Sequence, residues 1–167
     1  MLFDDILMQK AETLLAQCRA RSWRVSAAES CTGGLLAALL TEIPGSSAVI
    51  GRSFITYSNR AKHEILGVPV EVLQSEGAVS EAVVRAMAEG VLERTTAHLT
   101  IGISGVAGPG GGTPEKPAGF VCMATATEGG TMHATRRFGD IGRTAVRLAT
   151  IDNALDMMLA RLQETVQ

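Results

Sequence analysis

The order of the apolar segments decides most about the fold of this chain. Segments with apolar side chains three or four residues apart, which is helical spacing, alternate with short apolar runs that are typical of strands. Near the C-terminal end, Glu128-Gly129-Gly130 separates two such runs and predicts a hairpin. The expected helices span residues 6–19, 36–43, 59–67, 69–74, 80–95 and 143–163. The expected strands span residues 23–28, 49–57, 98–104, 120–127 and 131–138.

This order predicts an α/β fold. Helices that alternate with strands cover both faces of a sheet, and the late hairpin adds antiparallel strands to it. We therefore expect a three-layer α/β/α sandwich with a mixed sheet. The chain has 167 residues, 46% of them hydrophobic and 19% charged, which fits a globular core and excludes a disordered chain. Since no repeat or linker interrupts it, we expect one domain over residues 1–167.

The charge balance and the uncharged segments exclude two classes of partner. Lys and Arg number 15 against 17 Asp and Glu, so no basic field is available to bind a nucleic acid. The longest uncharged stretch, residues 95–114, contains six glycines and two prolines and makes a poor membrane-spanning helix. We therefore expect no nucleic-acid partner and no membrane segment.

The cysteines and the first residues point to a reducing compartment. Cys18, Cys31 and Cys122 form no C-x-x-C pair and have no clustered histidines, so the sequence predicts neither a disulfide framework nor a metal site, and no cofactor is expected. Acidic residues stand at positions 4 and 5, where a signal peptide would carry basic ones. A cytoplasmic protein is expected.

A candidate nucleophile follows the first expected strand. In open α/β sheets, ligands bind at the carboxyl ends of the strands, where Ser30, Tyr57 and the Ser104-Gly105 turn fall. Ser30 can act as a helix cap, or as a nucleophile whose oxyanion the helix N-terminus stabilises. Neither G-x-S-x-G nor S-x-x-K surrounds it, and no histidine has a triad context. A base must come from another residue type.

Lys62 can supply that base. With Ser58 as a cap, Lys62 lies one turn into its helix, beside Arg60 and His63 in sequence. Lowering a lysine pKa from ~10.4 to roughly 7–8 requires about 4 kcal/mol, which burial, the helix dipole and those neighbours together can provide. The alternative is a solvated helix lysine. Tyr57 either orients the substrate or relays a proton, or it packs at the end of its strand.

Two further features suggest a ligand with a phosphate. Residues 105–117 contain five glycines and three prolines, which favours close approach of a ligand to the backbone, although a structural loop explains the composition equally well. The loop matches neither a P-loop nor G-x-G-x-x-G. Arg143, at the start of the last helix, can clamp a phosphate or lie on a solvated face.

Four motifs in this order resemble the CinA C-terminal domain family, and the resemblance runs from about Leu7 to Leu162. It implies a three-layer α/β/α sandwich, usually dimeric, and the activity of that family's stand-alone nicotinamide mononucleotide deamidases, which release ammonia from a nicotinamide carboxamide. The motifs are A-E-S-C-T-G-G (28–34), T-Y-S-N-R-A-K (56–62) with L-G-V (66–68), G-A-V-S (77–80) and G-V-A-G-P-G-G-G-T-P-E-K-P (105–117).

The resemblance also implies roles for residues. Ser30 corresponds to the family's nucleophile, Lys62 to its general base, and Tyr57 to its active-site lining. From the expected helix start after Ser30, we expect backbone N–H groups at Cys31 and Thr32, or at Gly105, to stabilise the oxyanion. Ser104 stands where many relatives have Thr, and two extra residues precede Arg143. The expected substrate-binding residues are Cys31, Thr32, Gly33, Asn59, Ser104, Gly105, Gly108, Gly110, Gly111, Gly112, Thr113 and Arg143.

Other functions stay open at this point. The glycine loop could belong to a non-catalytic nucleotide-binding module, or the site could hydrolyse another small amide. Cys31 could replace Ser30 as a thiol nucleophile. As the resemblance implies, the expected partners are a small molecule, nicotinamide mononucleotide, and a second copy of the chain.

Overall fold

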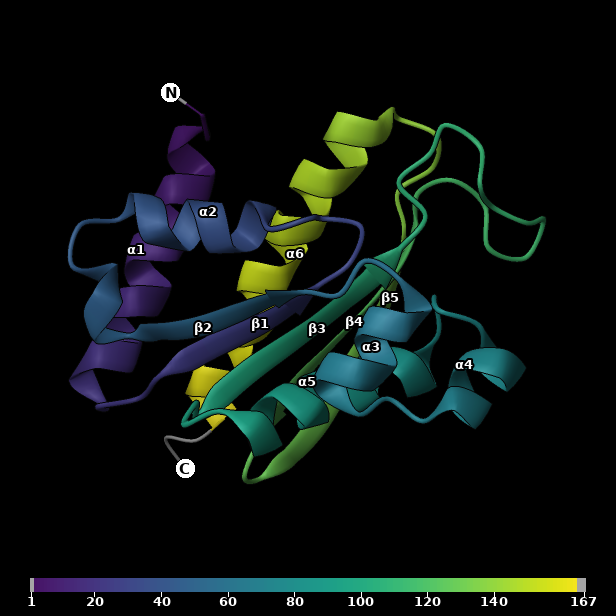
Figure 1. The fold of residues 1–167 in the computed structure, drawn as a ribbon. Helices are drawn as coiled ribbons and strands as arrows, with labels where there is room; N and C mark the ends of the chain where they lie inside the picture. The colour runs from purple at the N-terminus through teal and green to yellow at the C-terminus, as the bar shows by residue number, and fades with distance from the viewer. Residues whose placement is uncertain (1, 165–167) are drawn as a thin grey trace.

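One mixed five-stranded sheet forms the middle layer of the protein (Figure 1). The computed structural model describes residues 2–164, so Met1 and residues 165–167 of the expected domain lie outside it. In the strand order β2-β1-β3-β4-β5, β1 is parallel to β2 and β3, whereas β4 is antiparallel to β3 and β5. The strands are β1 (Val25–Glu29), β2 (Ile50–Ile55), β3 (Leu99–Gly105), β4 (Phe120–Thr127) and β5 (Gly130–Arg137).

Helices cover both faces of the sheet, which confirms the predicted three-layer sandwich (Figure 1). One apolar core lies between the sheet and α1, α2 and α6, and a second core lies beneath α3, α4 and α5. None of the helices within residues 2–164 has the length and hydropathy that crossing a membrane requires. The helices are α1 (Asp5–Ala20), α2 (Leu35–Glu42), α3 (Asn59–Leu66), α4 (Val70–Glu76), α5 (Glu81–Arg94) and α6 (Arg143–Glu164).

The predicted elements agree closely with the observed ones. Every predicted helix and strand is present, with ends that differ by two residues or fewer. The 3-10 helix at Ser46–Ala48 was not expected, because a single short turn after a proline has no periodic pattern to reveal it.

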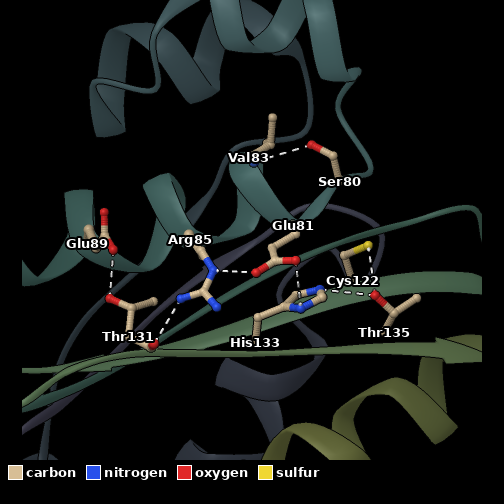
Figure 2. Close-up of polar contacts among 9 residues, drawn as sticks. All are labelled: Ser80, Glu81, Val83, Arg85, Glu89, Cys122, Thr131, His133 and Thr135. Carbon is tan, nitrogen blue, oxygen red and sulfur yellow. Dashed lines mark hydrogen bonds and ion pairs between the residues drawn. The ribbon is translucent and has the colours of Figure 1, made fainter.

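A polar network fixes α5 against the edge strand β5 (Figure 2). Arg85 pairs with Glu81 and donates to the backbone oxygen of Thr131, and Glu89 accepts from the Thr131 hydroxyl. His133 of β5 lies 3.4 Å from Glu81. These contacts hold the charged side chains of α5 against β5. The network also fixes the N-terminus of α5 beside the carboxyl ends of the parallel strands.

Glycines bring α3 and the sheet close to α5. A Cβ at Gly90 of α5 would overlap the backbone oxygen of Leu66 in α3. A Cβ at Gly102 of β3 would lie 2.7 Å from the Val84 oxygen of α5. The absence of side chains at these positions therefore permits close packing of the layer that carries Lys62.

Candidate functional site

Ser30 lies directly beyond the carboxyl end of the central strand β1. Its N–H donates to Ile103 O of β3, which extends the parallel pairing by one residue. The chain then turns through residues 31–34, and α2 begins only at Leu35 with Gly34 as its N-cap. The reading of Ser30 as a helix cap is therefore wrong. Gly33 and Gly34 have φ of 59° and 94°, and this left-handed turn delays the start of the helix.

Lys62 meets Ser30 from the adjacent helix α3. Ser58 caps this helix by accepting from the N–H of Ala61, as expected. Lys62 is 1% exposed, and its Nζ donates to Ser30 Oγ over 3.0 Å and to Thr56 O over 2.8 Å. The expected proximity of an alcohol and an amine separated by thirty-two positions is thus observed. The Thr56 carbonyl holds the amine at that place.

Burial lowers the pKa of Lys62 to about 8. The sequence-based interpretation added Arg60 and His63 as causes, but Arg60 points into solvent and pairs with Glu64, while the His63 ring contacts Val68 O. Cys31 acts in the opposite sense and raises the pKa slightly. Desolvation of the ammonium group is therefore the physical reason for a base at this position.

The neighbouring thiol has the opposite character. Cys31 is buried, and this burial raises its pKa to about 12. Only a thiolate is an effective nucleophile, so the thiol is inactive near neutral pH. The geometry therefore favours the hydroxyl of Ser30 over the sulfur of Cys31.

Ser30 and Lys62 open into a cleft of about 350 Å³ at the carboxyl ends of the parallel strands. The cleft brings together the segments after β1, β2 and β3 and the start of α6. Ser30, Tyr57 and Ser104, which were expected to meet at the strand ends, all line it, and so does Arg143. The lining residues are Ser30, Cys31, Tyr57, Lys62, Ala78, Val79, Ser104, Gly105, Val106, Ala107, Gly108, Pro109, Gly110, Gly111 and Arg143.

Some expected binding residues lie outside this lining. Thr32 is fully buried, and Asn59 is exposed at the start of α3. Thr113 accepts from Lys116 N and helps to close a turn within the glycine loop. The expected residues that do not line the cleft are Thr32, Gly33, Asn59, Gly112 and Thr113.

Two residues that line the cleft were not predicted from the sequence. Ala78 and Val79, between α4 and α5, line the cleft. Their motif was recognised, but small apolar side chains carry no chemical signal that assigns them to a site. Glu29 was likewise overlooked, although its fully buried carboxyl group accepts hydrogen bonds from the N-terminus of α2.

Arg143 joins two sides of the cleft. Its Nη1 donates to Gly108 O of the glycine loop over 2.8 Å, and its Nη2 donates to the Tyr57 hydroxyl over 2.9 Å. Tyr57 itself is 59% exposed. The arginine therefore reaches the cleft despite the two extra residues before it, and it places a guanidinium beside the backbone of the glycine loop.

A larger cavity of about 680 Å³ lies at the opposite end of the sheet. Trp23, which stacks on His98, and the Thr127–Gly129 turn line it. It lacks a nucleophile next to a buried base, so the smaller cleft is the better candidate for chemistry. Within residues 2–164, no three His, Cys, Asp or Glu side chains lie close enough together to hold a metal ion.

Comparisons with solved structures find closely similar folds. The competence/damage inducible protein CihA from Agrobacterium tumefaciens is 47% identical with a TM-score of 0.95, and the match covers 98% of this chain and 99% of that one. A CinA superfamily protein from Klebsiella pneumoniae is 35% identical with a TM-score of 0.90, and the match covers 95% of this chain and 98% of that one.

Sequence comparisons agree with these structures. A CinA-like protein of Synechococcus sp. (strain CC9902) is 52% identical over 160 residues, which are 95% of this chain and 38% of that protein. Among the curated relatives compared, the chain spans between 29% and 40% of their length. The model of the CinA C-terminal domain matches residues 7–162. The chain therefore belongs to the CinA C-terminal domain family.

Proposed function

We propose that this protein hydrolyses the carboxamide of nicotinamide mononucleotide to nicotinate mononucleotide and ammonia. The observation that carries the proposal is the buried Lys62 amine, 3.0 Å from the Ser30 hydroxyl at the floor of an open cleft. A serine next to a neutral amine is a nucleophile–base pair. The choice of nucleotide rests on the resemblance to the family's deamidases.

The first half of the reaction forms an acyl-enzyme. Neutral Lys62 accepts the proton of the Ser30 hydroxyl while Oγ attacks the carboxamide carbon. The carbonyl π bond opens, and a backbone N–H stabilises the oxyanion. The C–N bond then breaks, the protonated amine of Lys62 returns the proton to the nitrogen, and ammonia leaves.

The second half restores the enzyme. A water molecule gives a proton to Lys62 and attacks the ester carbon. The bond to Ser30 Oγ breaks, and Lys62 returns the proton to that oxygen. The carboxylic acid formed gives its proton to water, and the carboxylate product leaves. Thr56 O accepts from Nζ throughout, which keeps the amine within reach of each proton.

The remaining walls suit the nucleotide part of the substrate. Arg143 places a cation in the lining of the cleft. The space beside Gly110 and Gly111 is open, because a Cβ at either residue would meet no atom within 4 Å. A guanidinium and N–H groups are the donors that bind phosphate best. We assign Arg143 and the glycine loop to the phosphate and ribose, which orients the carboxamide toward Ser30.

Two expectations accompany this proposal. We propose that the protein acts as a homodimer, as the family resemblance implies, and light scattering on the purified chain measures its mass. We also place its activity in the cytoplasm, where pyridine nucleotides are salvaged, and fractionation of the source cells tests that location.

Turnover of nicotinamide mononucleotide tests the function. The purified protein is incubated with the nucleotide, ammonia is measured, and binding is followed by calorimetry. We expect ammonia in stoichiometry with nicotinate mononucleotide. Saturable binding without ammonia would identify a nucleotide-binding module instead. Turnover of other small amides, with none of this nucleotide, would show that the substrate is different.

A further inference from the structure

Glu29 is a buried acidic residue directly before the candidate nucleophile. It ends β1, has no exposed surface and accepts three hydrogen bonds from main-chain N–H groups. Within residues 2–164 no Lys, Arg or His forms an ion pair with it, so these donors and the N-terminal dipole of α2 compensate its charge. The three donors are Gly34 at 3.1 Å, Leu36 at 3.1 Å and Ala37 at 2.9 Å.

This arrangement changes where an oxyanion can be bound. The N-terminus of α2 was expected to stabilise negative charge from the substrate, but Glu29 already occupies it. Gly33 N donates to Ser30 O and Leu35 N to Thr32 O, so these groups are also occupied. In the described part of the chain, the N–H groups of Cys31 and Thr32 donate to no other residue, and that of Cys31 contacts only its own sulfur. Of these two residues only Cys31 lines the cleft, and Thr32 is fully buried. It is therefore the N–H next to Ser30 that a substrate oxyanion can use.

We propose that Glu29 is a positioning residue for this hydrolysis. Its carboxyl group holds the turn of residues 30–37 so that Ser30 Oγ faces Lys62 and the Cys31 N–H faces the substrate. The inference rests on the proposed function. It adds a role for Glu29, the residue before Ser30, and it assigns the Cys31 N–H as the oxyanion donor. Glu29 touches no substrate atom and acts only through the turn.

The chemistry of the three contacts explains why a carboxylate is needed. Two acceptor oxygens with several lone pairs can receive all three N–H groups. A glutamine at this position has one oxygen, and its amide N–H₂ would face a backbone donor, which leaves a buried group unpaired. The turn must then shift. A shift of 1 Å in a reacting group costs about 10²-fold in rate.

Steady-state kinetics of Glu29→Gln test the proposal. We expect kcat for ammonia release to fall about 10- to 100-fold, with KM changed less than about twofold. The matched control is Asp4→Asn, because Asp4 is a carboxylate that caps α1 through Leu7 N, away from the cleft. That variant should keep the wild-type kcat. An unchanged kcat in Glu29→Gln, or an equal loss in Asp4→Asn, overturns the proposal.

A second measurement needs no turnover. Cys31 is buried in the turn that Glu29 holds, so a shift of this turn in Glu29→Gln exposes the thiol to reagents. Iodoacetamide labelling at pH 9, read by peptide mass spectrometry, compares Cys31 with buried Cys18, which reports general loosening of the fold. We expect the Cys31/Cys18 labelling ratio to rise several-fold, and an unchanged ratio overturns the proposal.

The two measurements separate this proposal from the proposed function. If wild-type protein releases no ammonia, the proposed function fails, whereas the labelling ratio still decides whether Glu29 controls the turn. If wild-type protein releases ammonia and Glu29→Gln matches it, the function stands and the positioning role is rejected.

Discussion

The proposed chemistry depends on one buried lysine, Lys62. Moving the pKa of Lys62 from 10.5 to about 8 corresponds to about 3 kcal/mol in favour of the neutral amine. The structure supplies this energy through burial, with hydrogen bonds to Ser30 and Thr56 O that a neutral amine can also make. An exposed lysine would be almost fully protonated at neutral pH and could not accept a proton.

The pH dependence of turnover follows from this pKa. Below about pH 8 the ammonium form of Lys62 dominates, so kcat/KM should fall about tenfold for each further unit and level off above pH 8. Ammonia release is measured in overlapping buffers from pH 6 to 10. Lys62→Arg, which stays charged, should lack activity throughout this range. A wild-type profile that is flat between pH 6 and 9 would contradict the role of Lys62.

At the scale of elements, α3 carries the base and α5 sets its position. Gly90 lets the backbone of α3 approach α5, because any Cβ there overlaps Leu66 O. This contact lies one turn beyond Lys62 on the same short helix. The packing of two helices on the outer layer therefore determines the distance between Ser30 and Lys62.

Gly90→Ala tests this dependence. Alanine favours a helix by up to about 1 kcal/mol over glycine, but overpacking costs about 1–3 kcal/mol, so we expect a net loss of stability. We also expect a lower kcat, since α3 must move. Thermal unfolding and ammonia release measure the two effects. Gly129→Ala, in the turn between β4 and β5, is the control, because a Cβ there would make only an ordinary 3.5 Å contact with the Thr127 hydroxyl. If Gly90→Ala and the wild type have equal stability and equal kcat, the close contact at Gly90 does not determine the position of α3.

Elements were predictable from the sequence where apolar spacing was long and regular. The 22-residue α6 and the hairpin of β4 and β5 were predicted within one residue. The turn after Ser30 was not, because two glycines with positive φ break the expected strand-to-helix junction. The role of Glu29 was not predictable either, since its three partners are backbone groups, which no side-chain motif encodes.

For the whole molecule, the strand order creates the candidate site. With β1 between β2 and β3 and all three parallel, the segments after them meet at one edge of the sheet. The sequence predicted this convergence of Ser30, Tyr57 and Ser104 from three strand ends. It could not predict the depth of Lys62, because burial depends on how α3 packs over the sheet.

The buried lysine also has a consequence for global stability. Its folded-state pKa is lower than its unfolded one, so between about pH 8 and 10.5 the unfolded chain binds more protons and stability rises with pH. Below pH 8 this contribution is absent. Relative to Lys62→Met, the free energy of unfolding of the wild type should increase by up to about 3 kcal/mol across that window. Urea unfolding at pH 7.5 and 10 measures it, and a constant difference between the two proteins would contradict a lowered pKa.

The most direct test of the account is the rate of ammonia release from saturating nicotinamide mononucleotide by Ser30→Ala. Ser46→Ala, a buried serine outside the cleft, is the control and should match the wild type. We predict that Ser30→Ala still binds the nucleotide but loses turnover by on the order of 10³-fold or more. Ammonia release by Ser30→Ala at a rate close to that of the wild type would contradict the assignment of Ser30 as nucleophile.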